Sequence, residues 1–261
     1  ELKALKLMDE DYEYLTSFDC AKSVYRSDRK VLRFDGIDTI ADVYLNGEMI
    51  GSPDNMHRTW EYDVTEEVKE KGNELRIVFH SPNKYIAEAF QISKTHGSED
   101  AMDGFVNIRK AHCMFGWDWG AHLPDAGLFR PVTLLGVDEA RIDSVYVTQE
   151  HADGRVTLHF AVDVDCCPEM EDPSGMWNAE TEEASENEAD PQESGLYYTV
   201  KVTAPDGTQV HATGSPEQLV IENPQLWWPN GYGRQDLYTV DVTLYFEGKE
   251  LDCWKRRIGL R

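Results

Sequence analysis

Short apolar runs separated by turn residues dominate the first half of the chain, and they predict β-strands. Within 40–45, Val43 and Leu45 fall on one face and polar residues on the other, as in a half-buried strand. The Asn46-Gly47 pair that follows predicts a hairpin, because both central residues of a type I′ turn need a positive φ. Comparable runs predict further strands at 31–34, 48–50, 60–64, 75–79 and 132–135.

Helical signals are few in this half. Residues 65–69 fit a short helical turn ended by Gly72-Asn73, and a helix is expected after Pro82, reaching about Phe90. The stretch 96–104 is rich in glycine and acids and predicts a loop. Many short strands with few helices indicate a β-sandwich.

A second set of alternating runs begins at Ile142. The expected strands cover 142–148, 155–164, 196–203 and 237–246, with a turn predicted at Asp153-Gly154. Their spacing suits an immunoglobulin-like sandwich. We therefore predict an all-β chain of two domains.

One segment, 165–194, breaks this alternation. It holds eleven acidic residues and no lysine or arginine, so it carries nearly half of the formal charge of -24. A stretch of such low hydrophobicity buries too little surface to offset the entropy of ordering it, and we expect a flexible acidic insertion. The rival interpretation, a calcium site, lacks the ligand spacing of an EF-hand.

The composition of the chain excludes some classes of partner. The 261 residues include 49 acids and 25 bases, which argues against nucleic-acid and anionic-membrane partners. No apolar run is long enough to span a membrane and no signal peptide opens the chain. The five cysteines show no metal-type spacing, and adjacent Cys166-Cys167 suit a disulfide poorly, so we expect reduced thiols and a cytoplasmic location.

The stretch 115–120, Phe-Gly-Trp-Asp-Trp-Gly, is the strongest candidate for chemistry. Its indoles offer the flat apolar faces on which sugars pack, and the carboxylate of Asp118 can accept two hydroxyl hydrogen bonds. The flanking glycines permit a sharp turn or a close approach of the backbone. The alternative is a structural corner with two buried tryptophans and a capping aspartate.

The longer run 108–120 resembles a segment of the β-mannosidases of glycoside hydrolase family 2. Three other stretches resemble the same family and occur in the family's order: 34–47, Gly-Leu-Phe-Arg-Pro-Val at 127–132, and Leu-Trp-Trp-Pro-Asn-Gly-Tyr-Gly at 226–233. The Asn-Gly turn and the Trp-Trp-Pro run fit family 2 broadly. The Trp-Asp-Trp-Gly run points to β-mannosidases within it.

The resemblance implies a jelly-roll, galactose-binding-like domain over 1–137 and an immunoglobulin-like domain over 138–261. In the family, two glutamates on a (β/α)₈ barrel that follows these domains hydrolyse the substrate with retention. This chain has no barrel pattern, and 256–261 resembles the joint into the barrel. We therefore expect a non-catalytic part of an exo-β-mannosidase, with no catalytic residue, no cofactor and a β-mannoside partner reached through the barrel.

The resemblance also assigns roles to the central stretch. Trp117 would wall the subsite for the terminal sugar, Asp118 would bond the hydroxyls of the non-reducing mannose, and Trp119 would serve packing. A buried Arg109 paired with Asp118 is the structural alternative. His112 and Met114 replace the glutamine and histidine that β-mannosidases more often show, so the contacts around the tryptophan are left open.

Other interpretations stay open. Trp227-Trp228 would fit a sugar platform, but its position at a strand entry favours packing. No histidine pair has metal-binding helical spacing, and we expect no metal. The chain would also fit part of another family 2 enzyme, such as an exo-β-glucosaminidase, or a free-standing carbohydrate-binding module. The sequence does not indicate the oligomeric state.

Overall fold

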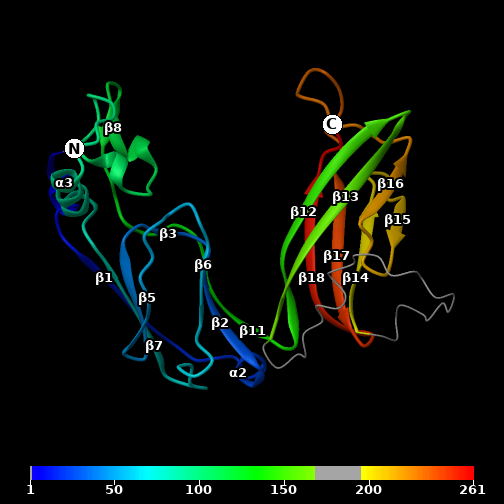
Figure 1. The fold of residues 1–261 in the computed structure, drawn as a ribbon, viewed down its shortest axis with the longest axis horizontal. Helices are drawn as coiled ribbons and strands as arrows, with labels where there is room; N and C mark the ends of the chain where they lie inside the picture. Colours follow the sequence, from blue (N-terminus) through cyan, green and yellow to red (C-terminus); the bar gives the residue numbers. More distant parts are fainter. Residues whose placement is uncertain (1, 168–194) are drawn as a thin grey trace. The chain divides into compact units, whose positions relative to one another are not determined.

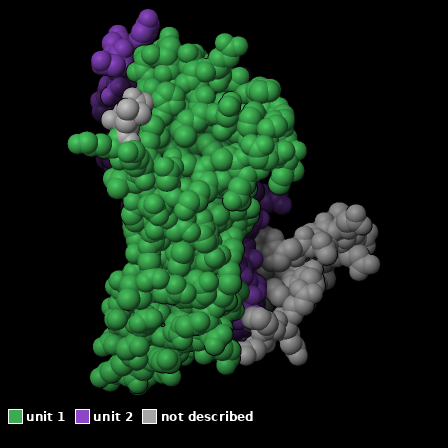
Figure 2. Space-filling model, turned by 90° about the vertical axis from the view of Figure 1, so that its left-hand side faces the viewer, with its two compact units in different colours: residues 1–137 green, residues 138–261 purple. Residues whose placement is uncertain are grey.

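The computed structural model describes residues 2–167 and 195–261, which fall into two compact units, 1–137 and 138–261 (Figures 1 and 2). The expected acidic insertion at 165–194 lies outside the described residues except for its first three positions. Two of these, Asp165 and Cys166, end strand β13.

Unit 1 is built almost entirely from antiparallel strands. One sheet has the strand order β1-β7-β4-β5 and another the order β11-β2-β6, with short pairs β10-β3 and β8-β9. The strands are β1 Tyr12–Phe18, β2 Arg29–Phe34, β3 Ile37–Asp38, β4 Ala41–Leu45, β5 Glu48–Gly51, β6 Trp60–Asp63, β7 Asn73–Phe79, β8 Phe115–Trp117, β9 Gly120–His122, β10 Gly127–Leu128 and β11 Val132–Val137. The helices are α1 Leu2–Leu7, α2 Lys22–Arg26, α3 Pro82–Ile92, η1 Phe105–Asn107 and η2 His112–Met114.

The core of unit 1 draws side chains from both of its larger sheets, as in a sandwich. Strand β4 buries every second residue, Val43 and Leu45 among them, which confirms the predicted alternation. The cluster comprises Cys20, Leu32, Phe34, Ile37, Ala41, Val43, Leu45, Val64, Val68, Leu75, Ile77 and Phe79. Burial of one such large side chain stabilises the fold by roughly 1.5–3 kcal/mol.

Local sequence signals are reproduced where they were strong. Asn46 and Gly47 have φ of 53° and 93°, as the predicted hairpin requires. Helix α3 begins at Pro82, where the hydroxyl of Ser81 accepts a hydrogen bond from the amide of Lys84. Helix α1 and strand β1 were not predicted, and the side chains of β1 are mostly exposed.

Unit 2 holds two antiparallel sheets, with strand orders β12-β13-β16 and β15-β14-β17-β18. The strands are β12 Ala140–Ala152, β13 Arg155–Cys166, β14 Leu196–Thr203, β15 Gln209–Ala212, β16 Gln218–Glu222, β17 Tyr238–Phe246 and β18 Lys249–Ile258. Each of the four strands expected here is present, and the Asp153-Gly154 turn has positive φ at both residues.

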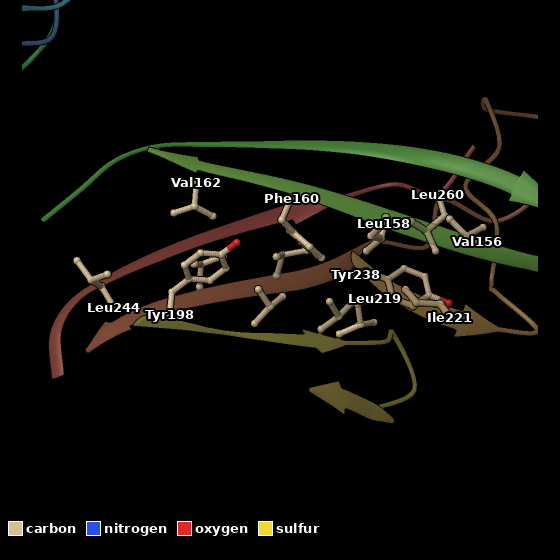
Figure 3. Packing of buried hydrophobic residues seen from close by; sticks show 14 of the residues in the cluster. Val156, Leu158, Phe160, Val162, Tyr198, Leu219, Ile221, Tyr238, Leu244 and Leu260 are labelled. Atoms are coloured by element: carbon tan, nitrogen blue, oxygen red, sulfur yellow. The ribbon is translucent and has the colours of Figure 1, made fainter. Parts of the chain in front are cut away.

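The inward residues of both sheets of unit 2 form one core. Figure 3 shows Leu158 and Phe160 of β13 lying between the sheets with Tyr198 of β14 and Tyr238 of β17. Because Leu158 is fully buried and its strand alternates between core and surface, a shift of register by one residue would place a polar side chain in this core. The all-β, two-sandwich fold class is thus confirmed.

None of the helices in the described part of the chain is long and apolar enough to cross a membrane.

Candidate functional site

The Trp-Asp-Trp stretch forms the turn of the hairpin β8–β9. Trp117 pairs with Gly120 across the hairpin, so Asp118 and Trp119 occupy its two-residue loop. Below the turn, Phe115 pairs with His122. We call residues 111–124, which carry this hairpin and η2, the tip loop.

The two indoles of the tip loop are exposed. Trp117 is 44% exposed and Trp119 is 82% exposed. Their ring centroids lie 5.4 Å apart with the ring planes tilted by 59°. This exposure contradicts the alternative of a structural corner with two buried tryptophans. Trp119, expected to serve packing, contacts the ring of Trp117 and is otherwise mostly exposed, because the loop of a two-residue hairpin projects its side chains away from the core.

The carboxylate of Asp118 is exposed beside these rings. Within residues 2–167 and 195–261, Asp118 forms no side-chain hydrogen bond or ion pair. Arg109 is exposed and does not pair with it, so the structural alternative of a buried Arg109–Asp118 pair is wrong. The structure instead leaves the acceptor oxygens of Asp118 open to solvent.

The base of the hairpin is held by a small apolar cluster. Phe115 is fully buried against Phe105, with ring centroids 6.1 Å apart, and Ile86 of α3 and Ile108 complete the cluster. Further support comes from the backbone, since the amide of Met102 donates to the carbonyl oxygen of Phe115 at 3.1 Å.

A buried ion pair at the start of the tip loop was missed by sequence reasoning. The side chain of Lys110 is 0% exposed and its ammonium group donates to the carboxylate of Asp38 and, at 2.6 Å, to the carbonyl oxygen of Asp125. The available signal was the alternation of Ile108, Arg109 and Lys110 along an extended segment, which turns the outer two inward.

The other candidate residues have surroundings that differ from those of the indole pair. His112 packs edge-on against Phe105, with centroids 4.9 Å apart, and Cys113 is exposed. In unit 2, Trp227 is half-buried against Gly259, and its amide donates to the carbonyl oxygen of Leu260 at 2.8 Å, as expected for packing. Trp228, by contrast, is 47% exposed.

The arrangement suits the recognition of a neutral, hydroxyl-rich ligand. The indole faces of Trp117 and Trp119 supply apolar surface, and Asp118 supplies two acceptor oxygens without a competing cation. No group of three His, Cys, Asp or Glu side chains that could hold a metal ion occurs among the residues described by the structure. The indoles and the carboxylate of the tip loop are therefore groups that could bind a ligand.

Comparison with known protein families agrees with the two-domain, all-β architecture described above. Residues 1–130 match the family model described as glycosyl hydrolase 2 galactose-binding domain-like, and residues 140–261 match that of glycosyl hydrolases family 2. The chain belongs to glycosyl hydrolase family 2.

Within this family, the chain is similar to β-mannosidases. It is 32% identical over 252 residues to β-mannosidase B of Thermothelomyces thermophilus, covering 96% of this chain and 27% of that protein. It is 28% identical over 260 residues to β-mannosidase of Mus musculus, covering 92% of this chain and 27% of that protein. The crystal structure of β-D-mannosidase from Dictyoglomus thermophilum superposes with a TM-score of 0.78 at 29% identity, covering 100% of this chain and 30% of that one. The chain thus spans less than a third of the length of these relatives.

Proposed function

We propose that this chain is the non-catalytic N-terminal part of a retaining exo-β-mannosidase, which removes terminal non-reducing β-D-mannose from oligosaccharides or glycoconjugates. Support comes from the similarity to β-mannosidases over nearly the whole chain, combined with the small share of those proteins that it spans. The catalytic carboxylates, on this proposal, lie in a part of the protein outside this chain.

The observation that carries the proposal is the exposed tip at 117–119. Trp117 forms a wall of the subsite for the terminal mannose, and Asp118 accepts hydrogen bonds from its hydroxyl groups. Two features of the geometry favour this assignment: both indoles are exposed, and the carboxylate has no cation partner within the described residues. Exposed aromatic surface of this kind commonly meets a ligand or a partner.

The two units have separate tasks on this proposal. Residues 1–137 form the jelly-roll, sugar-binding-type domain that carries the tip, and residues 138–261 form the immunoglobulin-like domain. The division of the compact units at Val137 and Asp138, and the gap between the two family matches, support these boundaries.

The test compares the full-length protein with this chain alone, using an aryl β-mannoside and an aryl β-glucosaminide. We expect the full-length protein to hydrolyse the mannoside in preference and this chain to hydrolyse neither, because on this proposal the two carboxylates that such catalysis needs lie outside it. Preference for the glucosaminide would assign the protein to a different family 2 activity. Turnover by this chain alone, surviving purification, would refute the non-catalytic assignment.

A calorimetric titration of this chain with mannose tests the remaining alternative, a free-standing carbohydrate-binding module. A carbohydrate-binding module should bind sugar by itself with useful affinity, whereas one wall of a pocket should not. Binding in the micromolar range, about -8 kcal/mol, would favour the module.

A further inference from the structure

The ammonium group of Lys110 is the least expected buried group in unit 1. Lysine is almost never fully buried unless it is paired, because its charge loses the stabilisation by water. Here the Lys110 side chain is 0% exposed and that of its partner Asp38 is 6% exposed. Replacement of a buried ion pair by apolar side chains is often neutral or stabilising, so stability alone gives little reason for this one.

The pair joins three separate segments of unit 1. Lys110 directly precedes the tip loop, and Asp125, whose carbonyl oxygen accepts from the ammonium at 2.6 Å, directly follows it. Asp38 lies in β3, which pairs with β10 immediately beyond Asp125. One side chain therefore closes the tip loop at its base and attaches both of its ends to β3.

The turn of the tip loop depends on its base for its position. Trp117, Asp118 and Trp119 are all exposed, so little packing holds the turn itself. Contacts inside the loop, such as the hydrogen bond from the amide of Leu123 to the carbonyl oxygen of Met114 at 2.9 Å, fix its shape but not its placement on the domain. Its placement comes from the apolar cluster around Phe115, from hydrogen bonds that join Met102 to Phe115 and His122 to Asp100, and from the Lys110–Asp38 ion pair, which we call the clamp.

We propose that Lys110 and Asp38 are positioning residues for substrate recognition, because their ion pair fixes where the tip loop presents Trp117 and Asp118. This inference rests on the proposed function of the tip. Displacement of a substrate-binding group by about 1 Å can lower kcat/KM by roughly 100-fold, so a clamp of this kind has a measurable consequence even though it lies away from the sugar.

The test uses the full-length protein with both charges removed together. Lys110→Met alone would leave the Asp38 carboxylate buried and unpaired, and that variant would lose stability for a reason unrelated to positioning. The double variant Lys110→Met/Asp38→Asn removes the clamp without an unpaired charge. We expect it to keep its thermal unfolding temperature and to lose about 10- to 100-fold in kcat/KM on an aryl β-mannoside.

A matched control removes an exposed ion pair of the same domain, that between Arg76 and Glu13 at 2.9 Å. Arg76→Met/Glu13→Gln should leave kcat/KM within about twofold of the wild type. The decisive measurement is the energetic coupling between the clamp variant and Asp118→Asn, because the ion pair is proposed to act by positioning Asp118. Adding Asp118→Asn to the clamp variant should lower kcat/KM little further, whereas a general structural defect would multiply with the loss from Asp118→Asn.

The outcomes separate the two proposals. If Asp118→Asn alone leaves kcat/KM unchanged, the proposed role of the tip fails. If Asp118→Asn lowers kcat/KM but the folded clamp variant keeps wild-type kinetics, or if the two losses multiply, the positioning role is overturned. Should the double variant not fold, Lys110→Gln/Asp38→Asn, which replaces the ion pair by two neutral amides and leaves no buried charge, must show the same loss and the same coupling to Asp118→Asn, or the inference fails.

Discussion

The imidazole of His122 lies against Gly116, so closely that a Cβ atom at Gly116 would stand 2.5 Å from two of its ring atoms. Gly116 also has a φ of 98°, which residues with a side chain rarely adopt. The hairpin that carries the two indoles therefore requires glycine at this position for two independent reasons.

Gly116→Ala should destabilise unit 1 by about 2–4 kcal/mol, since backbone strain and overpacking each cost on the order of 1–3 kcal/mol. Chemical unfolding followed by tryptophan fluorescence measures this loss. The matched control is Gly72→Ala in the same unit, because Gly72 has a φ of 66° but no atom within 4 Å of a Cβ. An equal loss in both variants would show that the contact with His122 contributes nothing.

The parts of the fold that were predictable are those in which a local pattern and the tertiary structure require the same residues. The hairpin at Asn46-Gly47 needs positive φ at both positions and has it. The alternating strand β13 needs a core for Leu158 and Phe160, and the second sheet provides that core. Strand β1 was missed because its backbone pairing with β7 holds it as an edge strand, and its mostly exposed side chains carry no burial signal.

The candidate site was predictable in its chemistry and less so in its contacts. Two indoles and a carboxylate at 117–119 suggested a sugar-facing turn, and the structure exposes all three side chains. Which of two adjacent cations faces inward depends on the path of an irregular segment. The sequence suggests Arg109, paired with Asp118, as the buried cation, whereas the structure buries Lys110 and pairs it with Asp38. Its partner Asp38 is 72 residues away, and no local pattern reports such a contact.

A pH-dependent contribution to stability is expected from His80, which lies between two carboxylates. Its Nδ1 is 3.3 Å from Asp11 and its Nε2 is 3.0 Å from Asp42. Burial lowers the pKa of His80, but the hydrogen bonds to Asp42 and Asp11 outweigh burial and raise the pKa above 6.5. The pKa of Asp11 is lowered, chiefly by the amide of Ser81. The pKa of Asp42 is also lowered, because hydrogen bonds from His80 and Ser52 exceed the effect of burial.

The signs of these shifts define the pH window. A raised histidine pKa stabilises the fold fully below pH 6.5, and that stabilisation is lost as the pH rises through the raised pKa. The lowered aspartate pKa values stabilise above pH 3.8, and this contribution is lost as the pH falls through them. The positive charge of Lys84 also lowers the pKa of Asp11, and that of Arg76 lowers the pKa of Asp42.

Wild type should therefore exceed His80→Gln in unfolding free energy at pH 5.5, and the difference should shrink by pH 8.5. The ion pairs of His80 with Asp11 and Asp42 are partly exposed, so we expect a difference of less than about 1 kcal/mol. Urea unfolding of both proteins at the two pH values measures it. A difference that grows with pH would contradict the arrangement of charges.

The cysteines should differ in reactivity according to burial. Cys113 and Cys253 are exposed, whereas Cys20 is buried, and burial raises the pKa of its thiol. Because the thiolate is the reactive form, Ellman's reagent at pH 8 should label Cys113 and Cys253 quickly and Cys20 only after unfolding. Single serine variants assign each phase. Fast labelling of Cys20 in the folded chain would show that the segment preceding α2 opens readily.

The final prediction concerns Asp118, whose carboxylate is exposed and has no partner within the described residues. Asp118→Asn should leave the unfolding free energy of this chain within about 0.5 kcal/mol of wild type, as expected for a surface substitution away from any contact. In the full-length protein it should lower kcat/KM on an aryl β-mannoside by about 10- to 150-fold, because hydrogen bonds to a charged group are worth roughly 1.5–3 kcal/mol.

Asp103→Asn is the matched control for this prediction, since Asp103 is another exposed carboxylate in unit 1. It should change neither the unfolding free energy nor kcat/KM, so a general effect of lost surface charge would be visible in both variants. The two measurements on Asp118→Asn then separate its roles. If this chain loses several degrees of thermal stability while the full-length protein keeps its kcat/KM, Asp118 stabilises the turn and does not bind the sugar. If kcat/KM falls and stability does not, the carboxylate acts on the substrate, because removal of its charge affects only the state in which the sugar is bound.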